Sequence, residues 1–177
     1  GFMGAGKSTI GRLLAARLER PYIDLDHHLE LRRGENIATI FQNHGEAMFR
    51  RWEAEDFAQL SKDPGPYVMA TGGGTFIDPM TFDLAHRTGV TIYLVVDFAT
   101  ALARATPGFR RPLMADGDPV ESDLQLRQLF HHRLPYYRSA DLHVDAAHGT
   151  AEDVVTRIVA LLPPAIVPPV LVKATPT

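Results

Sequence analysis

Helix-like and strand-like patterns of hydrophobic residues alternate along the chain. Behind a glycine-rich opening, apolar residues from Ile10 to Leu18 fall on one face of a helix that runs to about Glu19. Strands are predicted at PYIDLD (21–26), YVMAT (67–71), VTIYLVV (90–96) and DLHVD (141–145). Further helices are predicted at 36–43, 45–62 and 79–87, after the third strand to about Arg104, and at about 120–139 and 151–162.

The opening stretch GFMGAGKSTIG matches the phosphate-binding pattern G-x-x-x-x-G-K-[ST] at Gly1, Gly6, Lys7 and Ser8. In such a loop, backbone N–H groups point at phosphate oxygens, and the following helix adds its N-terminal dipole. We expect Lys7 to reach the β- and γ-phosphates of a nucleotide and Ser8 to ligate Mg²⁺. A plain glycine-rich turn is the alternative, but the strong helix pattern directly behind the loop favours nucleotide binding.

The alternation of strands and helices predicts an α/β fold of the P-loop NTPase type, with three layers, α/β/α, around a parallel sheet. The run at 90–96 is rich in β-branched residues, which is typical of a strand buried on both faces. A P-loop fold needs one more strand directly before Gly1, normally in the centre of the sheet. Without it, its neighbours would carry unpaired backbone groups in the interior. We therefore expect the natural protein to be longer at its N-terminus.

Two segments fall outside the regular pattern. TPGFRRPLMADGDP (106–119) breaks all periodicity, and we expect a mobile lid over about 105–119. From Pro163 the chain becomes proline-rich and apolar, which predicts a disordered or loosely attached tail. The chain of 177 residues is thus divided into one domain, residues 1–162, and a tail, residues 163–177.

Composition excludes several classes of protein. The chain has no cysteine, so a disulfide framework and a thiolate metal site are excluded. Its formal net charge of −3 indicates no nucleic-acid partner, and basic function must rest on a few placed arginines. The apolar stretches are too short to span a membrane, and nothing at the start reads as a signal peptide. We expect a cytoplasmic protein, acting as a monomer, with small-molecule partners.

Acidic residues follow the first predicted strand. Asp24 and Asp26 alternate at the end of that strand, so we expect their side chains to point to opposite sides. One would serve a metal ion and the other a substrate hydroxyl. Two solvated acids at a strand end are the alternative, but ligands in open α/β sheets bind at the carboxyl ends of strands, which favours function.

Arginines and glycines provide the other candidates. Arg50 and Arg51 lie in a predicted helix beside acidic residues, and for Arg51 we expect an exposed ion pair. Three glycines, 72–74, end a strand, which suits backbone that approaches a ligand. Arg111 lies in the lid segment, where it can reach a transferring phosphoryl group. Arg133 lies on the long helix, where a surface position is the alternative.

Other patterns favour structure over chemistry. The pairs His27-His28 and His131-His132 are adjacent residues, which do not share a helix face, so chelation of a metal by either pair is not expected. The apolar residues around Trp52 and Phe57 are expected in the core.

The chain resembles the shikimate kinase family from its start to about residue 162. Six motifs occur in the order and approximate spacing of that family. They are the loop GAGKST (4–9), the acidic pair in YIDLD, GEAMFRRWE (45–53), GGG (72–74), RPL (111–113) and RLPYYR (133–138).

This resemblance implies ATP-dependent phosphorylation of the 3-hydroxyl of shikimate, within aromatic amino-acid biosynthesis. It implies ATP binding by the loop, namely Gly4, Ala5, Gly6, Lys7, Ser8 and Thr9, and by Arg104 and Arg111. It implies that Asp24 acts through water on the Mg²⁺ held by Ser8. It implies a shikimate pocket made by Asp26, Arg50, Gly73 and Arg133, with the two arginines on the carboxylate. Lys7, Asp26 and Arg111 are implied as catalytic.

The chain departs from the family pattern after the last strand. The family often has an arginine-bearing adenine loop there, whereas this chain reads VDAAHGTAED (144–153). We expect His148 or a backbone group to replace that contact.

Two other functions fit parts of the pattern. A kinase for another polyol, such as gluconate, would keep the phosphate loop but would not need both Arg50 and Arg133 beside Asp26. A ligand-sensing domain without catalysis would be expected to lose phosphate or pocket residues, and the candidate residues are all present.

Overall fold

The computed structural model describes residues 1–63, 65–105 and 119–167. The strands are β1 (Tyr22–Asp24), β2 (Val68–Ala70), β3 (Ile92–Val95) and β4 (Leu142–Asp145). The helices are α1 (Lys7–Arg17), α2 (Leu25–Arg33), α3 (Ile37–Leu60), α4 (Pro79–Thr88), α5 (Phe98–Arg104), α7 (Pro119–Arg138) and α8 (Ala151–Leu161), with a short 3-10 helix, η1 (Thr75–Ile77). None of these helices, within the described residues, is long and apolar enough to cross a membrane.

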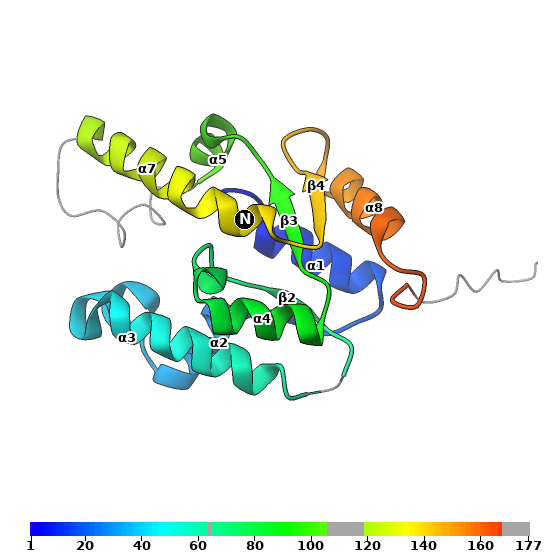
Figure 1. The fold of residues 1–177 in the computed structure, drawn as a ribbon, viewed down its shortest axis with the longest axis horizontal. Helices are drawn as coiled ribbons and strands as arrows, with labels where there is room; N and C mark the ends of the chain where they lie inside the picture. Colours follow the sequence, from blue (N-terminus) through cyan, green and yellow to red (C-terminus); the bar gives the residue numbers. More distant parts are fainter. Residues whose placement is uncertain (64, 106–118, 168–177) are drawn as a thin grey trace, which may run out of the picture.

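Helix α1 divides the molecule into two parts. It packs on α8 on one side and on β1 and β2 on the other. Helices α2, α3 and α4 lie together with the β1–β2 pair, whereas α5, α7 and α8 lie on the side of β3 and β4 (Figure 1). The phosphate loop, which is the matched pattern from Gly1 to Ser8, leads into α1 where these two parts meet. Residues from both parts can therefore reach the loop.

The strands form two parallel pairs in the described part of the chain. Tyr22 aligns with Val68 in the β1–β2 pair, and Ile92 aligns with Leu142 in the β3–β4 pair. These pairs confirm the predicted α/β class with parallel strands. A largely apolar cavity of about 650 Å³ lies between them, lined by residues of β2 and β3 and by Gly1. The expected strand before Gly1 stays a prediction.

Polar side chains begin most of the helices. The carboxylate, amide or hydroxyl oxygen of the residue before the helix accepts a hydrogen bond from a backbone N–H in its first turn, which satisfies a donor that the helix leaves unpaired. These capping residues are Asp24 for α2, Asn36 for α3, Asp78 for α4, Asp97 for α5 and Thr150 for α8.

The prediction of a strand over residues 21–26 was wrong at its C-terminal end. The strand stops at Asp24, which caps α2, and residues 25–33 form a helix that the sequence analysis did not predict. Leu25 and Leu29, four residues apart, are fully buried, which is helical spacing. The helix ends at Gly34, whose φ of 71° lies in the left-handed region. Asp26 therefore lies in the first turn of α2 and not in the strand.

The break between the predicted helices 36–43 and 45–62 is confirmed at Gly45. This residue has φ 77° and ψ 168° inside α3, a conformation that glycine adopts without a steric penalty. Phe57 belongs to the buried core, and Trp52 packs partly buried against the cluster of Leu29, Ile40 and Phe49, as expected for both.

The first residues after 162 lie against the body of the protein. Ile166 packs on the main hydrophobic cluster, and its carbonyl accepts a hydrogen bond from the Arg20 guanidinium. The domain boundary at 162 stays a prediction. The lid segment, apart from its terminal residues Ala105 and Pro119, lies outside the described residues.

An aromatic cluster fixes the start of the phosphate loop. Phe2 is fully buried, and its ring contacts Phe98 of α5 and Phe130 of α7, with centroids 6.4 Å and 5.2 Å away. The contact with Phe130 is edge-to-face, an arrangement that aromatic pairs favour. The loop is thus anchored to two helices that are distant in the sequence.

We predict that Phe2→Ala lowers the free energy of unfolding by about 3–5 kcal/mol, because the substitution leaves a cavity in a packed aromatic cluster. Urea unfolding followed by far-UV circular dichroism measures this. Met80→Ala is the control, since Met80 is 79% exposed, and its effect is expected within about 0.5 kcal/mol. A loss below about 1 kcal/mol for Phe2→Ala would show that the cluster does not anchor the loop.

Candidate active site

The phosphate loop is shaped by two glycines with positive φ. Gly4 has φ 72° and Gly6 has φ 88°, both in the left-handed region. A Cβ at Gly4 would stand 2.0 Å from the carbonyl oxygen of Ala101, so the loop touches the backbone of α5 directly. Helix α1 begins at Lys7, and its N-terminal N–H groups with their dipole form a site for an anion.

Lys7 lies folded over its own loop. Its Nζ donates hydrogen bonds to the carbonyls of Gly1, at 3.0 Å, and Phe2, at 2.9 Å. Burial lowers the pKa of Lys7 to about 8; nearby Arg133 acts in the same direction, while Asp26 and Asp24 oppose it. A phosphate group at the loop would counter the effect of burial and hold this side chain in its charged form.

Ser8 and Asp24 form the next contact around the loop. The hydroxyl of Ser8 donates to Asp24 Oδ2 at 2.9 Å, and the hydroxyl of Tyr22 donates to the same oxygen at 2.9 Å. The expectation that Asp24 and Asp26 point to opposite sides of a strand was wrong, because Asp26 lies in the first turn of α2. Both carboxylates line one cavity.

The oxygens of Ser8 and Asp24 fit a magnesium ion that takes its remaining ligands from phosphate and water. No group of three or more histidine, cysteine or acidic side chains in the described residues is arranged to hold a metal ion. Mg²⁺ commonly takes one or two protein oxygens and completes its shell with phosphate oxygens and water. The hydroxyl and carboxylate at the mouth of the phosphate loop are such oxygens.

Asp26 is held in a cavity of mixed charge. Burial, the nearby Glu53 and Asp24 raise its pKa from 3.8 to about 6, while Lys7 and Arg50 oppose the rise. A Cβ on Gly72 would stand 3.2 Å from Asp26 Oδ1. The carboxylate therefore lies close to the three glycines of residues 72–74, which we call the glycine loop. At neutral pH the group is mostly ionised, and it can accept a hydrogen bond or a proton from a hydroxyl.

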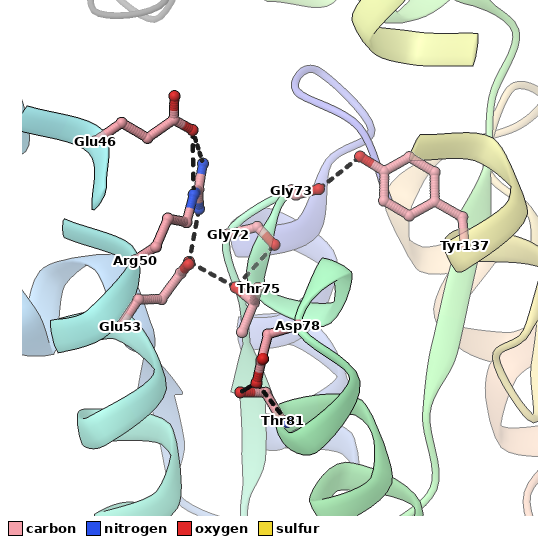
Figure 2. A network of polar contacts seen from close by, with 9 residues as sticks. All are labelled: Glu46, Arg50, Glu53, Gly72, Gly73, Thr75, Asp78, Thr81 and Tyr137. Carbon is pink, nitrogen blue, oxygen red and sulfur yellow. Dashed lines mark hydrogen bonds and ion pairs between the residues drawn. The ribbon is translucent and has the colours of Figure 1, made fainter. Parts of the chain in front are cut away.

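Arg50 is held by two acids on its own helix (Figure 2). Its Nη1 donates to Glu53 Oε2 at 2.7 Å, and Glu46 accepts from the other side of the guanidinium at 3.3 Å. Glu53 is almost fully buried and also accepts a hydrogen bond from Thr75 Oγ1 at 2.6 Å. Arg50 is therefore fixed beside the glycine loop. Arg51 is exposed and pairs with Glu55, as expected.

Arg133 is the buried cation of the site. Its side chain is only 5% exposed, so the surface position considered for it was wrong. Its Nε has no hydrogen-bond partner in the described residues. A buried donor without a partner is costly, and an anionic ligand in the cavity would satisfy it. Its Nη1 would stand 3.4 Å from a Cβ on Gly73.

Arg104 lines the same cavity and contacts the segment after β4. Its guanidinium donates to the carbonyls of Ala146 at 2.6 Å and Ala147 at 2.8 Å. His148, expected as a replacement contact for adenine, is exposed and pairs with Asp145 Oδ2 at 2.8 Å. Whether it contacts a nucleotide stays a prediction.

A single cavity of about 620 Å³ brings the candidates together. It is lined by residues of the phosphate loop, both aspartates, the two arginines Arg50 and Arg133, the glycine loop and Arg104. Its lining includes Gly4, Ala5, Gly6, Lys7, Ser8, Thr9, Asp24, Asp26, Arg50, Gly73, Arg104 and Arg133. Arg111 lies outside the described residues.

Comparison with known proteins points to one family. A family model described as shikimate kinase matches residues 3–163. The chain is 39% identical over 158 residues to a shikimate kinase from Paramagnetospirillum magneticum, covering 89% of this chain and 79% of that protein. It is 41% identical over 156 residues to one from Dechloromonas aromatica, covering 88% and 83%. It matches the structure of an Acinetobacter baumannii shikimate kinase in complex with shikimate with a TM-score of 0.83 and 33% identity, covering 91% of this chain and 88% of that one.

The chain belongs to the shikimate kinase family. Its reaction is the transfer of a phosphoryl group from ATP to a hydroxyl of shikimate, which confirms the predicted enzyme class. The matched relatives favour shikimate over gluconate as the acceptor.

The sequence analysis missed two residues of this shikimate kinase site. Glu53 was considered only as an acid near Arg50, and Thr75 was not considered at all. The signal for Glu53 was its position three residues after Arg50 on the same helix, a spacing at which side chains meet. Thr75 directly follows the three glycines, but nothing in the sequence pairs it with a residue 22 positions earlier.

We predict that the stability of Asp26→Asn relative to wild type rises with pH. Because the pKa of Asp26 is raised from 3.8 to about 6 in the folded chain, its contribution to stability is present below about pH 4 and is lost as the pH rises through about 6. Asparagine does not titrate, so the difference in unfolding free energy should shift by about 1–2 kcal/mol in favour of the variant between about pH 4 and pH 7.

Urea unfolding at both pH values measures this shift. The matched control is Asp83→Asn, an exposed aspartate on α4, whose difference from wild type should not change over that range. A pH-independent difference for Asp26→Asn would contradict the assigned environment.

Proposed function

We propose that this chain transfers the γ-phosphoryl group of ATP to the 3-hydroxyl of shikimate with the residues of this cavity in the roles given below. The observation that carries the proposal is the convergence of a phosphate loop, an acidic pair and two arginines on one cavity. Phosphoryl transfer needs positioning and neutralisation of charge more than covalent chemistry by the protein, and this set of side chains supplies both.

The acceptor end of the cavity suits a small anionic polyol. Arg133 offers an unpartnered buried donor, and Arg50 is fixed beside the glycine loop by Glu53. Two guanidinium groups can hold one carboxylate in a defined orientation, because each presents parallel donors. Asp26 supplies the acceptor for ring hydroxyls, and Gly73 leaves room for backbone contact with the ligand.

The donor end binds the nucleotide. The loop of residues 4–9 and the N-terminus of α1 would hold the β- and γ-phosphates, with Lys7 exchanging its carbonyl partners for phosphate oxygens. Arg104 holds the segment after β4 at the nucleotide side. We assign to Arg111 a contact with the transferring phosphoryl group on the resemblance alone.

Ser8 and Asp24 would hold the Mg²⁺ that accompanies ATP, Ser8 directly and Asp24 through water. The ion supplies positive charge to the phosphate oxygens when it is bound. Asp24 needs no rearrangement for this role, because it already contacts the Ser8 hydroxyl.

Asp26 orients the attacking hydroxyl and accepts its proton. With a pKa of about 6, the carboxylate is ionised in most molecules at neutral pH yet basic enough to share a proton with a hydroxyl. Burial and the neighbouring Glu53 and Asp24 raise this basicity.

We propose that the enzyme acts as a monomer. We place the enzyme in the cytoplasm, where ATP is available.

We predict shikimate-dependent release of ADP, with quinate and gluconate as much poorer acceptors, because the family model and the matched relatives are shikimate kinases. A coupled assay of ADP with each acceptor in turn, at equal Mg²⁺ and ATP, measures this. No turnover with shikimate, or a preference for gluconate, would reject the proposed function.

We predict that Arg133→Ala raises KM for shikimate about 30-fold or more, because it removes a buried charged donor from a carboxylate, and leaves KM for ATP within about twofold of wild type. Steady-state kinetics with each substrate varied measures both. Arg51→Ala is the matched control, since Arg51 is 71% exposed and should change neither constant. Equal weakening of both substrates by Arg133→Ala would place Arg133 outside the acceptor pocket.

A further inference from the structure

Tyr137 makes a hydrogen bond for which the reaction gives no role. Its hydroxyl donates to the carbonyl oxygen of Gly73 at 2.7 Å (Figure 2). The side chain is 8% exposed, and its ring stacks on Tyr93 of β3 with centroids 5.4 Å apart. Burial raises the pKa of Tyr137 to about 12, so the hydroxyl keeps its proton and remains a donor over the working range of pH.

Tyr137 and Arg133 lie one turn apart on α7 and meet the same glycine. A Cβ on Gly73 would stand 3.3 Å from the Tyr137 hydroxyl, 3.4 Å from Arg133 Nη1 and 3.3 Å from the carbonyl of Gly1. The peptide at Gly73 is thus enclosed by α7 on one side and by the start of the phosphate loop on another. Because a peptide unit is planar, fixing the carbonyl of Gly73 also fixes the N–H of Gly74.

The other end of the glycine loop is held from α3. Thr75 Oγ1 donates to Glu53 Oε1 and also contacts the carbonyl of Gly72 at 3.1 Å. The guanidinium of Arg50 would lie 2.8 Å from a Cβ on Gly74. The loop is therefore held at one end through Glu53, which also holds Arg50, and at Gly73 by the helix that carries Arg133.

We propose that Tyr137 is a positioning residue of the acceptor site. Its hydrogen bond to the Gly73 carbonyl holds the glycine loop in a fixed position relative to Arg133. Loop and arginine then meet the acceptor as one preorganised unit, and the acceptor does not have to order them on binding. This inference rests on the proposed function, because it concerns the same acceptor site.

The hydroxyl, and not the ring, carries this role. The ring of Tyr137 fills space against Tyr93, and phenylalanine would fill it equally. The neighbouring Tyr136 is 37% exposed, and its ring contacts His132 on its own helix. The two tyrosines therefore form a matched pair in which only Tyr137 bonds the glycine loop within the described residues.

The test compares Tyr137→Phe with Tyr136→Phe in the full chain. Tyr137→Phe removes the hydrogen bond to the Gly73 carbonyl and the interaction of the hydroxyl with Arg133, which predicts a rise of about 3- to 10-fold in KM for shikimate. We expect KM for ATP within about twofold of wild type. Tyr136→Phe should leave both constants unchanged. Thermal unfolding of each variant reports whether the fold is retained.

A general loss of structure would raise the KM values for shikimate and ATP together, or would raise KM for shikimate equally in Tyr137→Phe and Tyr136→Phe. Either result overturns the inference. An unchanged KM for shikimate in Tyr137→Phe also overturns it. If the unmodified chain shows no turnover of shikimate, the proposed function fails, and this inference fails with it.

A second comparison uses Gly73→Ala. The added methyl group would stand close to the Tyr137 hydroxyl. Part of the expected rise in KM for shikimate should therefore come from this contact. In the Tyr137→Phe background, Gly73→Ala should therefore raise KM for shikimate by a smaller factor than it does alone. Factors that multiply independently would show that Tyr137 and Gly73 do not act as a unit.

Discussion

The packing of Phe2 between Phe98 and Phe130 sets the geometry of the whole site. Phe98 lies on α5, the helix that also carries Arg104, and Phe130 lies three residues before Arg133 on α7. The phosphate loop is therefore joined through one buried ring to the helix of Arg104, which we propose for the nucleotide, and to the helix of Arg133, which we propose for the acceptor. Cores are close-packed and transmit small shifts, so a displacement of this ring would move the loop and both arginines relative to one another.

The charged side chains that line the cavity nearly balance. Asp24, Asp26 and Glu53 share the cavity with Lys7, Arg50 and Arg133. Burial pushes Asp26 and Lys7 toward their neutral forms, which is why the pKa of the first rises and that of the second falls. Anionic substrates add negative charge beside the cations, and a metal ion would add positive charge beside the acids. The site is thus arranged so that its ligands complete the electrostatics.

Periodicity was sufficient for the α/β class and for most of the helices and strands, because these depend on local patterns. The set of candidate residues that meet in the cavity came largely from the resemblance to the family. Periodicity failed at Asp26, because the strand ends at Asp24, which accepts a capping hydrogen bond from the His27 N–H, and residues 25–33 form a helix. It also missed the network behind the pocket. The bonds Thr75–Glu53 and Tyr137–Gly73 join positions 22 and 64 residues apart, and no local pattern records which distant side chain meets which carbonyl.

The segment after β4 is held partly through its backbone carbonyls. Arg104 donates to the carbonyls of Ala146 and Ala147, and Arg157 donates to the carbonyls of Asp145 and His148. A carbonyl is the same in every residue type, so these four contacts do not require a particular side chain at the residue that accepts the bond. The position of the segment is therefore set largely by Arg104 and Arg157, which belong to helices on either side of it in the sequence.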